Sequence, residues 1–536
     1  MKTWIIIFAI LLCCGQAAAT NYYVDFDSGN NANAGTQALP WRNIPGTQSP
    51  YGGVTSGWQS LVADDIIYLR AGTTHSSADG GRILIDSTWY GNGTEGHPIS
   101  IQVLDGWGSG TVTINGTGIS GILFRITSRN WIEVKGTATN RLLLTNSAAQ
   151  GFQSNGSGPS TRQTGLRLRY MDFTYAPSIA GCVITYSDGF EVRDCTASYN
   201  SSKGFAQGED SPSFNDGGKF YDCVAHHNGG GGGGNSWHGF GQYDAINTLY
   251  YNCTAYSNTR DGFDFGTTST SPDNANYGSA ILVNSTAYDN GEAGFACNGV
   301  APAYEANRHD YWYINCISYG NSMGWQIYCG VYARLYHCVA ENNTSRAAEI
   351  FTTPSVCGSV AIKTRNNVFS NHSWAMFYGY CPEPSTGIED YDYNFYERGS
   401  YTGAQFVCNY FLECFTWAQL AAWRTYVVGD AHTNIDVGTG LASNFTDRAG
   451  HIYTPTASSN GLLNSGVYIT SGIESDLTVV AYAQTDRNGN PRANPPDIGA
   501  YEYGSGGTTY NSSISLGAKG FSAPNLRGAR FGATVN

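Results

Sequence analysis

The sequence predicts an all-β solenoid in which short parallel strands stack coil upon coil. Three observations lead to this fold class: a local frame that repeats along the middle of the chain, asparagine and glycine at constant places beside it, and a composition poor in helix formers. The 536 residues include 68 Gly, 37 Tyr and 23 Phe, and 13% are charged. Aromatic and β-branched residues suit strands, whereas Asn and Gly suit turns.

The repeated frame spans nine residues and ends in asparagine. In register, the seven segments read VRDCTASYN, FYDCVAHHN, YYNCTAYSN, LVNSTAYDN, YINCISYGN, LYHCVAENN and KTRNNVFSN. The fourth positions are Cys195, Cys223, Cys253, Ser285, Cys316, Cys338 and Asn366, and the final positions are Asn200, Asn228, Asn258, Asn290, Asn321, Asn343 and Asn371. Because the frame is constant while successive frames lie 22 to 32 residues apart, we expect stacked coils with loops of unequal length.

Most frames are followed by a glycine and an aromatic residue, as in Gly204-Phe205 and Gly262-Phe263. Asn and Gly tolerate bent or left-handed backbone and therefore mark corners. Stacked parallel strands lie about 4.8 Å apart, so equivalent residues of successive coils form ladders. We expect an inward ladder of cysteines, a hydrogen-bonding ladder of asparagines at a corner and inward aromatic rings. If a disulfide forms, Cys408 and Cys414, outside the repeat, are the expected pair.

The N-terminus has the pattern of a secretory signal over residues 1–19. Lys2 precedes an apolar run over residues 5–14, and three alanines at 17–19 fit the small-residue cleavage rule. The run is shorter than the roughly 20 residues that a membrane span needs, and no later stretch reaches that length. We therefore expect a protein secreted to the cell exterior or the periplasm, with no membrane span.

The folded part is expected to form one elongated domain over residues 20–503. We place a cap at about 20–65, coils at about 66–395 and a loop-rich closing region at 396–503. Residues 504–536 form a Gly/Ser-rich tail. The formal net charge of −13 argues against nucleic acid as a partner, because nucleic-acid binding needs a basic face. We expect a monomer.

Three further segments carry a resemblance to a known superfamily. They are the opening NYYVDFDSGNNANAGTQALPWRNI, the segment DDIIYLRAGT from Asp64, and the close RNGNPRANPPDIGAYEYG, which ends at Gly504. Together with the repeat, they resemble exported bacterial proteins of the pectate-lyase-like superfamily over roughly residues 21–503. The resemblance implies a single-stranded right-handed parallel β-helix. Such scaffolds carry lyases, hydrolases, epimerases and non-catalytic surface proteins, so the resemblance is specific for architecture.

A candidate site emerges when the glycine-aromatic pairs are laid over one another. If each glycine is a corner, alternation breaks there, and the residues on either side of the pair both face solvent. The residues before the glycine are Lys203, His238, Asp261, Ala293 and Met323, and those after the aromatic residue are Ala206, Gly241, Asp264, Ala296 and Gln326. We therefore expect Lys203, His238 and Asp261 on three successive coils, with Arg260 beside them and Glu349 further along the same face.

These residue types fit the cleavage of an acidic polysaccharide. In a lyase, a base removes the proton beside a uronate carboxylate while a cation stabilises the developing negative charge. His238 and Lys203 are the candidate bases and Arg260 is the candidate cation. Asp261 and Asp264 are candidate Ca²⁺ ligands, although Ca²⁺ takes six to eight oxygens. Exposed aromatic rings for stacking on sugars are expected at Trp237, Tyr243, Tyr304 and Tyr311.

Within the superfamily, the site segments resemble the family 9 pectate lyases. There an Asp-Gly-Phe segment and, one coil later, Asp-Asp-Gly-Trp-Asp hold calcium, and a lysine base follows in a Gly-Phe-Lys context. Here His238 stands at the first calcium-ligand position, and Arg260 replaces a second. Asp261 and Asp264 match the remaining two ligands, and Ala296 stands in place of the lysine. This departure puts that family's mechanism in doubt for this chain.

The leading functional hypothesis is a lyase that cleaves a uronate-containing polysaccharide by β-elimination. The alternative of another class is a non-catalytic glycan-binding or cell-surface structural protein, which the replaced lysine favours. A glycoside hydrolase is a second alternative, for which inversion would need about 6.5–9.5 Å between two carboxyl groups. Asp261 and Asp264 could also simply be solvated or cap their own turn.

Overall fold

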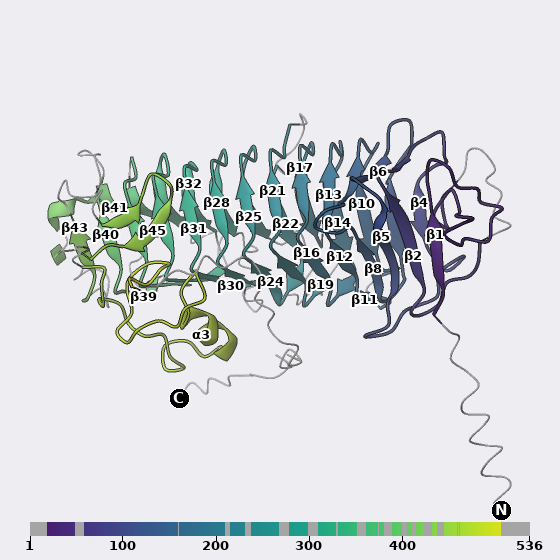
Figure 1. Cartoon of the computed structure of the whole chain (residues 1–536). Coiled ribbons are helices and arrows are strands. Elements are labelled where there is room, and N and C mark those ends of the chain that lie inside the picture. Colours follow the sequence, from purple (N-terminus) through teal and green to yellow (C-terminus); the bar gives the residue numbers. More distant parts are fainter. Residues whose placement is uncertain are drawn as a thin grey trace, which may run out of the picture.

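The computed structural model describes residues 19–48, 58–158, 160–208, 215–230, 237–266, 278–297, 309–328, 331–350, 361–373, 375–379, 388–398, 405–409, 414–419, 421–422, 431–436, 444–457, 459 and 461–504. In these residues the chain forms a single-stranded right-handed parallel β-helix (Figure 1). Three sheets of 13 strands each run the length of the solenoid, and each full coil contributes one strand to every sheet. The predicted fold class is confirmed.

The first sheet is parallel throughout. Its strands are β1 (Asn21–Val24), β2 (Ile66–Ala71), β5 (Ile99–Gly108), β8 (Ile132–Lys135), β12 (Arg167–Arg169), β16 (Glu191–Arg193), β20 (Lys219–Tyr221), β24 (Thr248–Tyr251), β27 (Ser279–Val283), β30 (His309–Ile314), β33 (Val331–Tyr336), β36 (Ala361–Arg365) and β39 (Ile388–Asp392).

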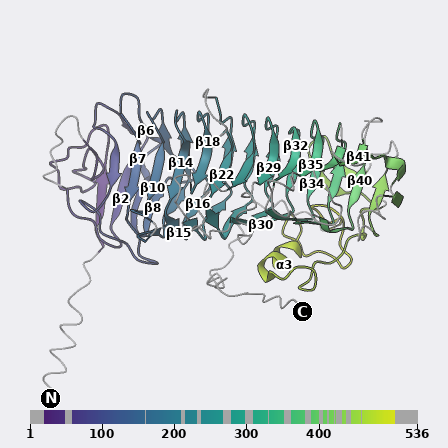
Figure 2. The same cartoon turned by 180° about the vertical axis from the view of Figure 1, so that it is seen from behind.

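The second sheet carries the candidate site and is seen from behind in Figure 2, where β18, β22, β29 and β32 follow one another along the axis. Its strands are β4 (Ile83–Ile85), β7 (Phe124–Thr127), β10 (Phe152–Asn155), β14 (Ala180–Thr185), β18 (Lys203–Gln207), β22 (Phe240–Tyr243), β26 (Phe263–Gly266), β29 (Ala293–Cys297), β32 (Met323–Ile327), β35 (Arg346–Ile350), β38 (Ala375–Gly379), β41 (Gln405–Asn409) and the antiparallel β42 (Cys414–Phe415).

The third sheet precedes the second in every full coil. Its strands are β3 (Thr74–His75), β6 (Val112–Asn115), β9 (Leu142–Thr145), β13 (Met171–Thr174), β17 (Thr196–Ser198), β21 (Val224–His226), β25 (Thr254–Tyr256), β28 (Thr286–Tyr288), β31 (Ile317–Tyr319), β34 (Val339–Glu341), β37 (Val368–Ser370), β40 (Phe395–Glu397) and β43 (Asn434–Asp436).

Smaller elements complete the described structure. A four-stranded sheet joins the second and first sheets, and an antiparallel pair, a 3-10 turn and a helix follow the coils. They are β11 (Gln163–Thr164), β15 (Ser187–Asp188), β19 (Asn215–Asp216), β23 (Ala245–Ile246), β44 (Phe445–Asp447), β45 (Ile452–Pro455), η2 (Trp417–Gln419) and α3 (Leu477–Ala483).

The asparagine ladder lies at the corner between the third and second sheets. From Asn200 to Asn321, each side-chain amide donates to the side-chain oxygen of the asparagine on the next coil, with Nδ2–Oδ1 distances of 3.0 Å from Asn200 to Asn228 and 2.9 Å from Asn228 to Asn258. The same amide also reaches a backbone oxygen of the preceding coil, as Asn228 does at Ala197. These bonds satisfy buried polar groups at a bend, which explains why asparagine recurs there.

The interior is built from the two other predicted ladders. Cys195, Cys223, Cys253, Cys316 and Cys338 are buried and unbridged, and Ser285 takes the same place. Stacked aromatic rings form a second column, with centroids 4.7 Å apart between Phe240 and Phe263 and 5.1 Å between Phe263 and Phe295. Apolar burial of this kind supplies most of the favourable free energy of folding.

The seventh frame is displaced by one residue from its predicted register. Because Val339 pairs with Val368, Cys338 lies opposite Asn367, and His372 takes the place of the corner asparagine. Asn366 and Asn371 lie instead opposite His337 and Asn342. The prediction for Asn366 and Asn371 was therefore wrong, since two adjacent asparagines fit the same frame in sequence but only one register continues the strand pairing.

Strand pairing also extends beyond the predicted limits of the coils. Within the region assigned to the cap, β1 already pairs with β2 in the first sheet. At the other end, β40 pairs with β43, so the third sheet continues to Asp436. β41 and β42 place Cys408 opposite Cys414 in backbone register, which leaves their disulfide a prediction. Residues 1–18 and 505–536, with most of the predicted signal and tail, lie outside the described residues.

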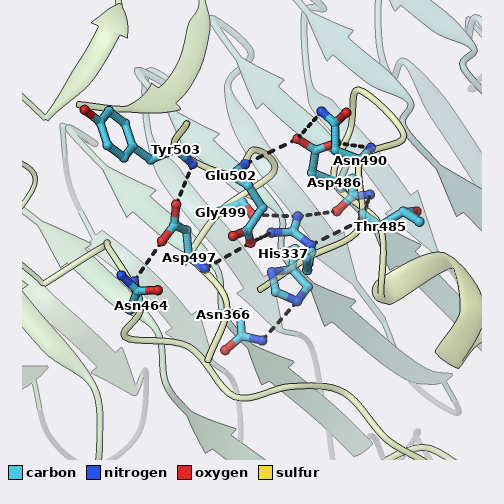
Figure 3. A network of polar contacts seen from close by, with 12 residues as sticks. His337, Asn366, Asn464, Thr485, Asp486, Asn490, Asp497, Gly499, Glu502 and Tyr503 are labelled. Atoms are coloured by element: carbon cyan, nitrogen blue, oxygen red, sulfur yellow. Dashed lines mark hydrogen bonds and ion pairs between the residues drawn. The ribbon is translucent and has the colours of Figure 1, made fainter. Parts of the chain in front are cut away.

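The closing segment (residues 461–504) runs along the side of the coils, where α3 lies in Figure 1. Val479 and Ala483 of α3 pack with Val283, Ile314 and Tyr336 of the first sheet. A network of buried polar contacts, which we call the closing cluster, anchors the end of the segment, and Figure 3 labels Asp486, Asp497 and Glu502 among its members. Its fourth charged member, Arg492, donates to Glu502. No helix in the described part of the chain is long and apolar enough to cross a membrane.

Candidate functional site

The candidate site arises where glycine interrupts the alternation of the second sheet. A Cβ atom on Gly239 would lie 2.9 Å from Nδ2 of Asn258 and 3.1 Å from Cβ of Ala255, so this position faces the interior. The next residue, Phe240, is also in the core. Two successive inward positions leave His238 and Gly241 on the outer side of the coil. The same geometry repeats at Gly204 and Gly262.

Backbone hydrogen bonds place the candidate residues in register. The amide of Gly204 donates to the carbonyl of His238 at 3.1 Å, and that of Gly239 donates to the carbonyl of Asp261 at 3.0 Å. Lys203, His238 and Asp261 therefore occupy equivalent positions on three successive coils. In the neighbouring column, Gly241 pairs with Asp264.

The side chains of these two columns meet around one imidazole ring. Nδ1 of His238 lies 3.0 Å from Oδ2 of Asp261, and Nε2 lies 3.2 Å from Oδ2 of Asp264. Oδ1 of Asp261 accepts a hydrogen bond of 2.8 Å from the amide of Ala293 on the next coil. His238 is thus held between two carboxylates, one of which is fixed by backbone.

Lys203 and Tyr243 extend this arrangement. The hydroxyl of Tyr243 donates to Oδ2 of Asp264 at 2.7 Å, and Nζ of Lys203 lies 4.4 Å from the centroid of the Tyr243 ring. A Cβ atom on Gly241 would lie 2.8 Å from Cδ of Lys203, so glycine leaves room for the lysine to cross the strand. We call these five side chains, Lys203, His238, Tyr243, Asp261 and Asp264, the site cluster.

The site cluster contains two carboxylates and two basic groups. Burial and the nearby charge of Lys203 both lower the pKa of His238. The carboxylates of Asp264 and Asp261 have the larger combined effect and raise this pKa above 6.5. Burial raises the pKa of Asp261, against the effect of His238. With His238 protonated, the two cations and two carboxylates balance. Buried ions are costly to desolvate, and only close pairing offsets that cost.

The predicted solvent exposure of the columns is wrong. Only 3% of Lys203, 2% of His238, 2% of Asp261 and 5% of Asp264 is exposed, whereas Tyr243 is half-buried. Tyr311 is also buried rather than exposed, because it stacks on Phe265 in the core. Tyr304 lies outside the described residues, and Trp237 is partly exposed.

Arg260 lies at the edge of the site cluster. Its Nη2 and Nε atoms each lie 2.6 Å from Oε2 of Glu292 on the next coil, and both side chains are about a quarter exposed, at 28% and 29%. Burial would lower the pKa of Arg260, but Glu292, Asp261 and Asp264 raise it. Arg260 therefore keeps its charge at a position that solvent reaches.

Glu349 joins the same face, as expected, three coils beyond Asp264. The column runs from Asp264 through Ala296 and Gln326 to Glu349. Glu349 forms an ion pair with Arg346 and is buried, and burial raises its pKa.

The donor set does not fit a shared Ca²⁺. The imidazole of His238 occupies the space between Asp261 and Asp264, and each carboxylate already faces one of its nitrogens. Among the described residues, no group of three or more His, Cys, Asp or Glu side chains is arranged to hold a metal ion. Ca²⁺ requires six to eight oxygens. The calcium site remains a prediction from sequence that this geometry does not favour.

Two contributions were missed by sequence reasoning. Tyr243 was considered only for stacking on sugars, and Glu292 was not considered. Tyr243 lies two residues beyond Gly241 on the same strand, and residues two apart on a strand face the same side of the sheet. This spacing could have placed Tyr243 on the same face as the site. Its contact with Asp264, 21 residues later, depends on stacking of the coils.

The chain was compared with known proteins. No protein-family model matches the sequence, and no curated protein matches it. Among solved structures, a complex of XylC with xylose aligns with a TM-score of 0.55 at 8% identity over 90% of this chain and 98% of its own. Pectate lyase Pel9A aligns with a TM-score of 0.46 at 15% identity, over 91% of this chain and 97% of its own. A rhamnogalacturonan lyase aligns with a TM-score of 0.46 at 14% identity, over 80% of this chain and 91% of its own.

These comparisons define a class by fold. At such identities, structural likeness shows architecture alone, and the XylC alignment supports the β-helix over nearly the whole of both chains. The chain is a right-handed parallel β-helix protein.

Proposed function

We propose that the protein is a secreted polysaccharide lyase that cleaves a uronate-containing polymer by β-elimination. The observation that carries this proposal is the site cluster itself. At the equivalent places on the next two coils stand Ala293 and Ala296, then Met323 and Gln326, so the repeat does not require charge there, although Arg346 and Glu349 form an ion pair one coil further. Charged groups buried where the fold accepts alanine are best explained by chemistry.

The available groups suit this reaction class. Elimination needs a group that takes the proton beside the uronate carboxylate and a cation that stabilises the charge developing on that carboxylate. Arg260 supplies a partly exposed cation held by Glu292. Lys203, His238 and the two aspartates supply a neutral, preorganised set of acid and base groups beside it. No step requires calcium from these residues.

Support for a saccharide substrate is of a coarser kind. One protein of the same fold is described as a complex with xylose. Fold alone does not define a substrate, so the choice of an acidic polymer rests on the cationic residues of this chain. Export remains an expectation from the first 19 residues.

The test is direct. The mature protein is incubated with polygalacturonate, alginate and glycosaminoglycans, with calcium or with a chelator, and the ultraviolet absorbance of unsaturated ends is followed. We expect product from the wild type with and without chelator, and none from His238→Ala or Asp261→Ala. Met323→Ala, in the same column two coils beyond Asp261, is the matched control and should remain active.

Other outcomes separate the alternatives. New reducing ends without ultraviolet absorbance would indicate a glycoside hydrolase. Strict dependence on calcium would support the calcium prediction. If the wild type releases nothing from any polymer, the lyase proposal fails and a non-catalytic glycan-binding or structural role takes its place.

A further inference from the structure

The side chain of His238 is poorly placed to act as the base. Both of its ring nitrogens face carboxylate oxygens, at 3.0 Å and 3.2 Å, and the ring is 2% exposed. An imidazole between two carboxylates is stabilised as the imidazolium, in which neither nitrogen has a free lone pair. The proton-accepting group must therefore be sought elsewhere in the site cluster.

Tyr243 is the member of the site cluster that reaches the surface. It is half-buried, while the other four residues are at most 5% exposed. Its hydroxyl donates to Asp264 at 2.7 Å, so an acceptor for the phenol proton is already in place. Asp264 is oriented in turn by His238, and His238 by Asp261.

Lys203 is placed where it would stabilise a negative charge on Tyr243. Its ammonium nitrogen lies 4.4 Å from the centre of the tyrosine ring. A cation near the ring favours the phenolate over the phenol. Gly241 makes this approach possible, because a Cβ atom there would lie 2.8 Å from Cδ of Lys203. The glycine of this strand and the lysine of the preceding coil are thus fitted to one another.

We propose that Tyr243 is the catalytic residue that takes and returns the proton, and that Asp264, His238, Asp261 and Lys203 position it. This inference rests on the proposed lyase function and deepens it. It assigns the proton transfer to a phenol rather than to the lysine or histidine expected from the sequence.

The proposed step balances in protons and electrons. The phenol proton of Tyr243 passes to Asp264, and the phenolate takes the proton from the carbon beside the uronate carboxylate. The electrons of that carbon–hydrogen bond form the new double bond, and the carbon–oxygen bond to the leaving sugar breaks with its electron pair on oxygen. Tyr243 gives its proton to this oxygen and recovers one from Asp264. Arg260 faces the carboxylate on which charge develops.

The key variant is Tyr243→Phe, which retains the ring beside Lys203 and removes only the hydroxyl. We expect kcat to fall by about 10²- to 10⁴-fold, the usual contribution of general acid–base catalysis, with KM changed only a few-fold. Tyr256→Phe is the matched control, because Tyr256 is a half-buried tyrosine of the third sheet and stacks on Tyr288. It should retain wild-type kcat.

A second variant tests the positioning without removing a polar group. Gly241→Ala places a methyl group in the path of Lys203, and it should lower kcat while the unfolding midpoint stays near that of the wild type. The double variant Gly241→Ala/Lys203→Ala should not recover the wild-type kcat, because it lacks the cation beside the ring of Tyr243.

The outcomes distinguish this inference from the proposed function. If Tyr243→Phe keeps full activity while His238→Ala and Asp261→Ala are inactive, the role of Tyr243 is overturned and the lyase function stands. If the wild type forms no unsaturated product from any polymer, both fail. Should Tyr243→Phe not fold, wild-type kcat in Gly241→Ala would overturn the assignment.

Discussion

The site cluster and the closing cluster are both buried and charged, but their charges are directed at different partners. In the closing cluster, Arg492 donates to the backbone oxygens of Thr485 and Gly499, and Asp497 accepts from the amides of Asn464 and Tyr503 (Figure 3). Arg492 also forms an ion pair with Glu502. In the site cluster, the ion pairs of His238 join side chains to one another, and the backbone contact described above is the one from the amide of Ala293 to Asp261.

This difference separates a structural role from a chemical one. Arg492 also bonds Oδ1 of Asn315 at 2.8 Å, a residue 177 positions earlier, and thereby fastens the closing segment to the coils. The site cluster lies within consecutive coils that backbone pairing already holds together. We conclude that the closing cluster is needed for docking of the closing segment, whereas the fold could dispense with the site cluster.

The largest effect on stability is expected for Arg492→Met. It leaves Glu502, at 2.8 Å from the guanidinium, and several oxygens buried without their partner. Breaking a buried ion pair in this way costs about 3–5 kcal/mol. Urea unfolding and limited proteolysis of the closing segment would measure the loss. Arg169→Met, at a partly exposed ion pair with Glu191, is the control and should cost about 0–1 kcal/mol. Equal losses in both variants would contradict the comparison.

A combined replacement of the site cluster should have the opposite effect on stability. Lys203→Ala, His238→Met, Asp261→Ala and Asp264→Ala together give it the kind of residues found on the following coils. Replacing buried charges by apolar groups is often neutral or stabilising by about 1–4 kcal/mol. Thermal and urea unfolding should show a stability equal to or above that of the wild type, with all lyase activity lost.

The single variant Asp264→Ala is the informative counterpart. It leaves His238 and Lys203 with one carboxylate and should destabilise the protein, by up to about 3–5 kcal/mol. If the fourfold variant proved as unstable as the single one, the site cluster would be part of the structural framework after all.

The pH dependence of stability should distinguish two kinds of buried histidine. The pKa of His238 is raised in the folded state, so its contribution is present below about 6.5 and is lost as the pH rises through the raised value. Burial lowers the pKa of His309 to about 4, so its contribution is lost as the pH falls from about 6.5 to about 4.

Unfolding free energies measured across pH for His238→Gln and His309→Gln would test these signs. The first variant should flatten the loss of stability on the alkaline side, and the second should flatten the loss on the acidic side. The reverse assignment would show that His238 is neutral in the folded protein, contrary to the charge balance of the site cluster.

The smallest effect is expected within the cysteine ladder. Cys253 lies on the column in which Ser285 occupies the next coil, and Ser285 donates to the carbonyls of Tyr250 and Val283. Cys253→Ser can make equivalent bonds and should change the unfolding free energy by about 1 kcal/mol or less. A loss well above this in a denaturant titration would show that the column does not accept a hydroxyl at every coil.

The ladders were predictable because their cause is local. Asparagine at a bend and a small residue before a strand recur on successive coils, so the sequence repeats them. The seventh frame shows the limit of this reasoning. Asn366 and Asn367 are adjacent, and a slip of one residue is invisible until the pairing of Val339 with Val368 is known.

The site was predictable in part. The positions of Lys203, His238 and Asp261 followed from the constant frame, and their shared column is present. The sequence did not predict that these residues are buried or that His238 lies between two carboxylates, because both features depend on how side chains of neighbouring coils are oriented. The contact of Tyr243 with Asp264 and the passage of Lys203 over Gly241 were hidden for the same reason.

The amino-acid order alone determined the stacked architecture, since a periodic local signal needs no knowledge of distant contacts. Only the folded arrangement decided which acids and bases share protons and which arginine anchors the closing segment to the coils, because those partners are set by proximity in space between residues of separate coils.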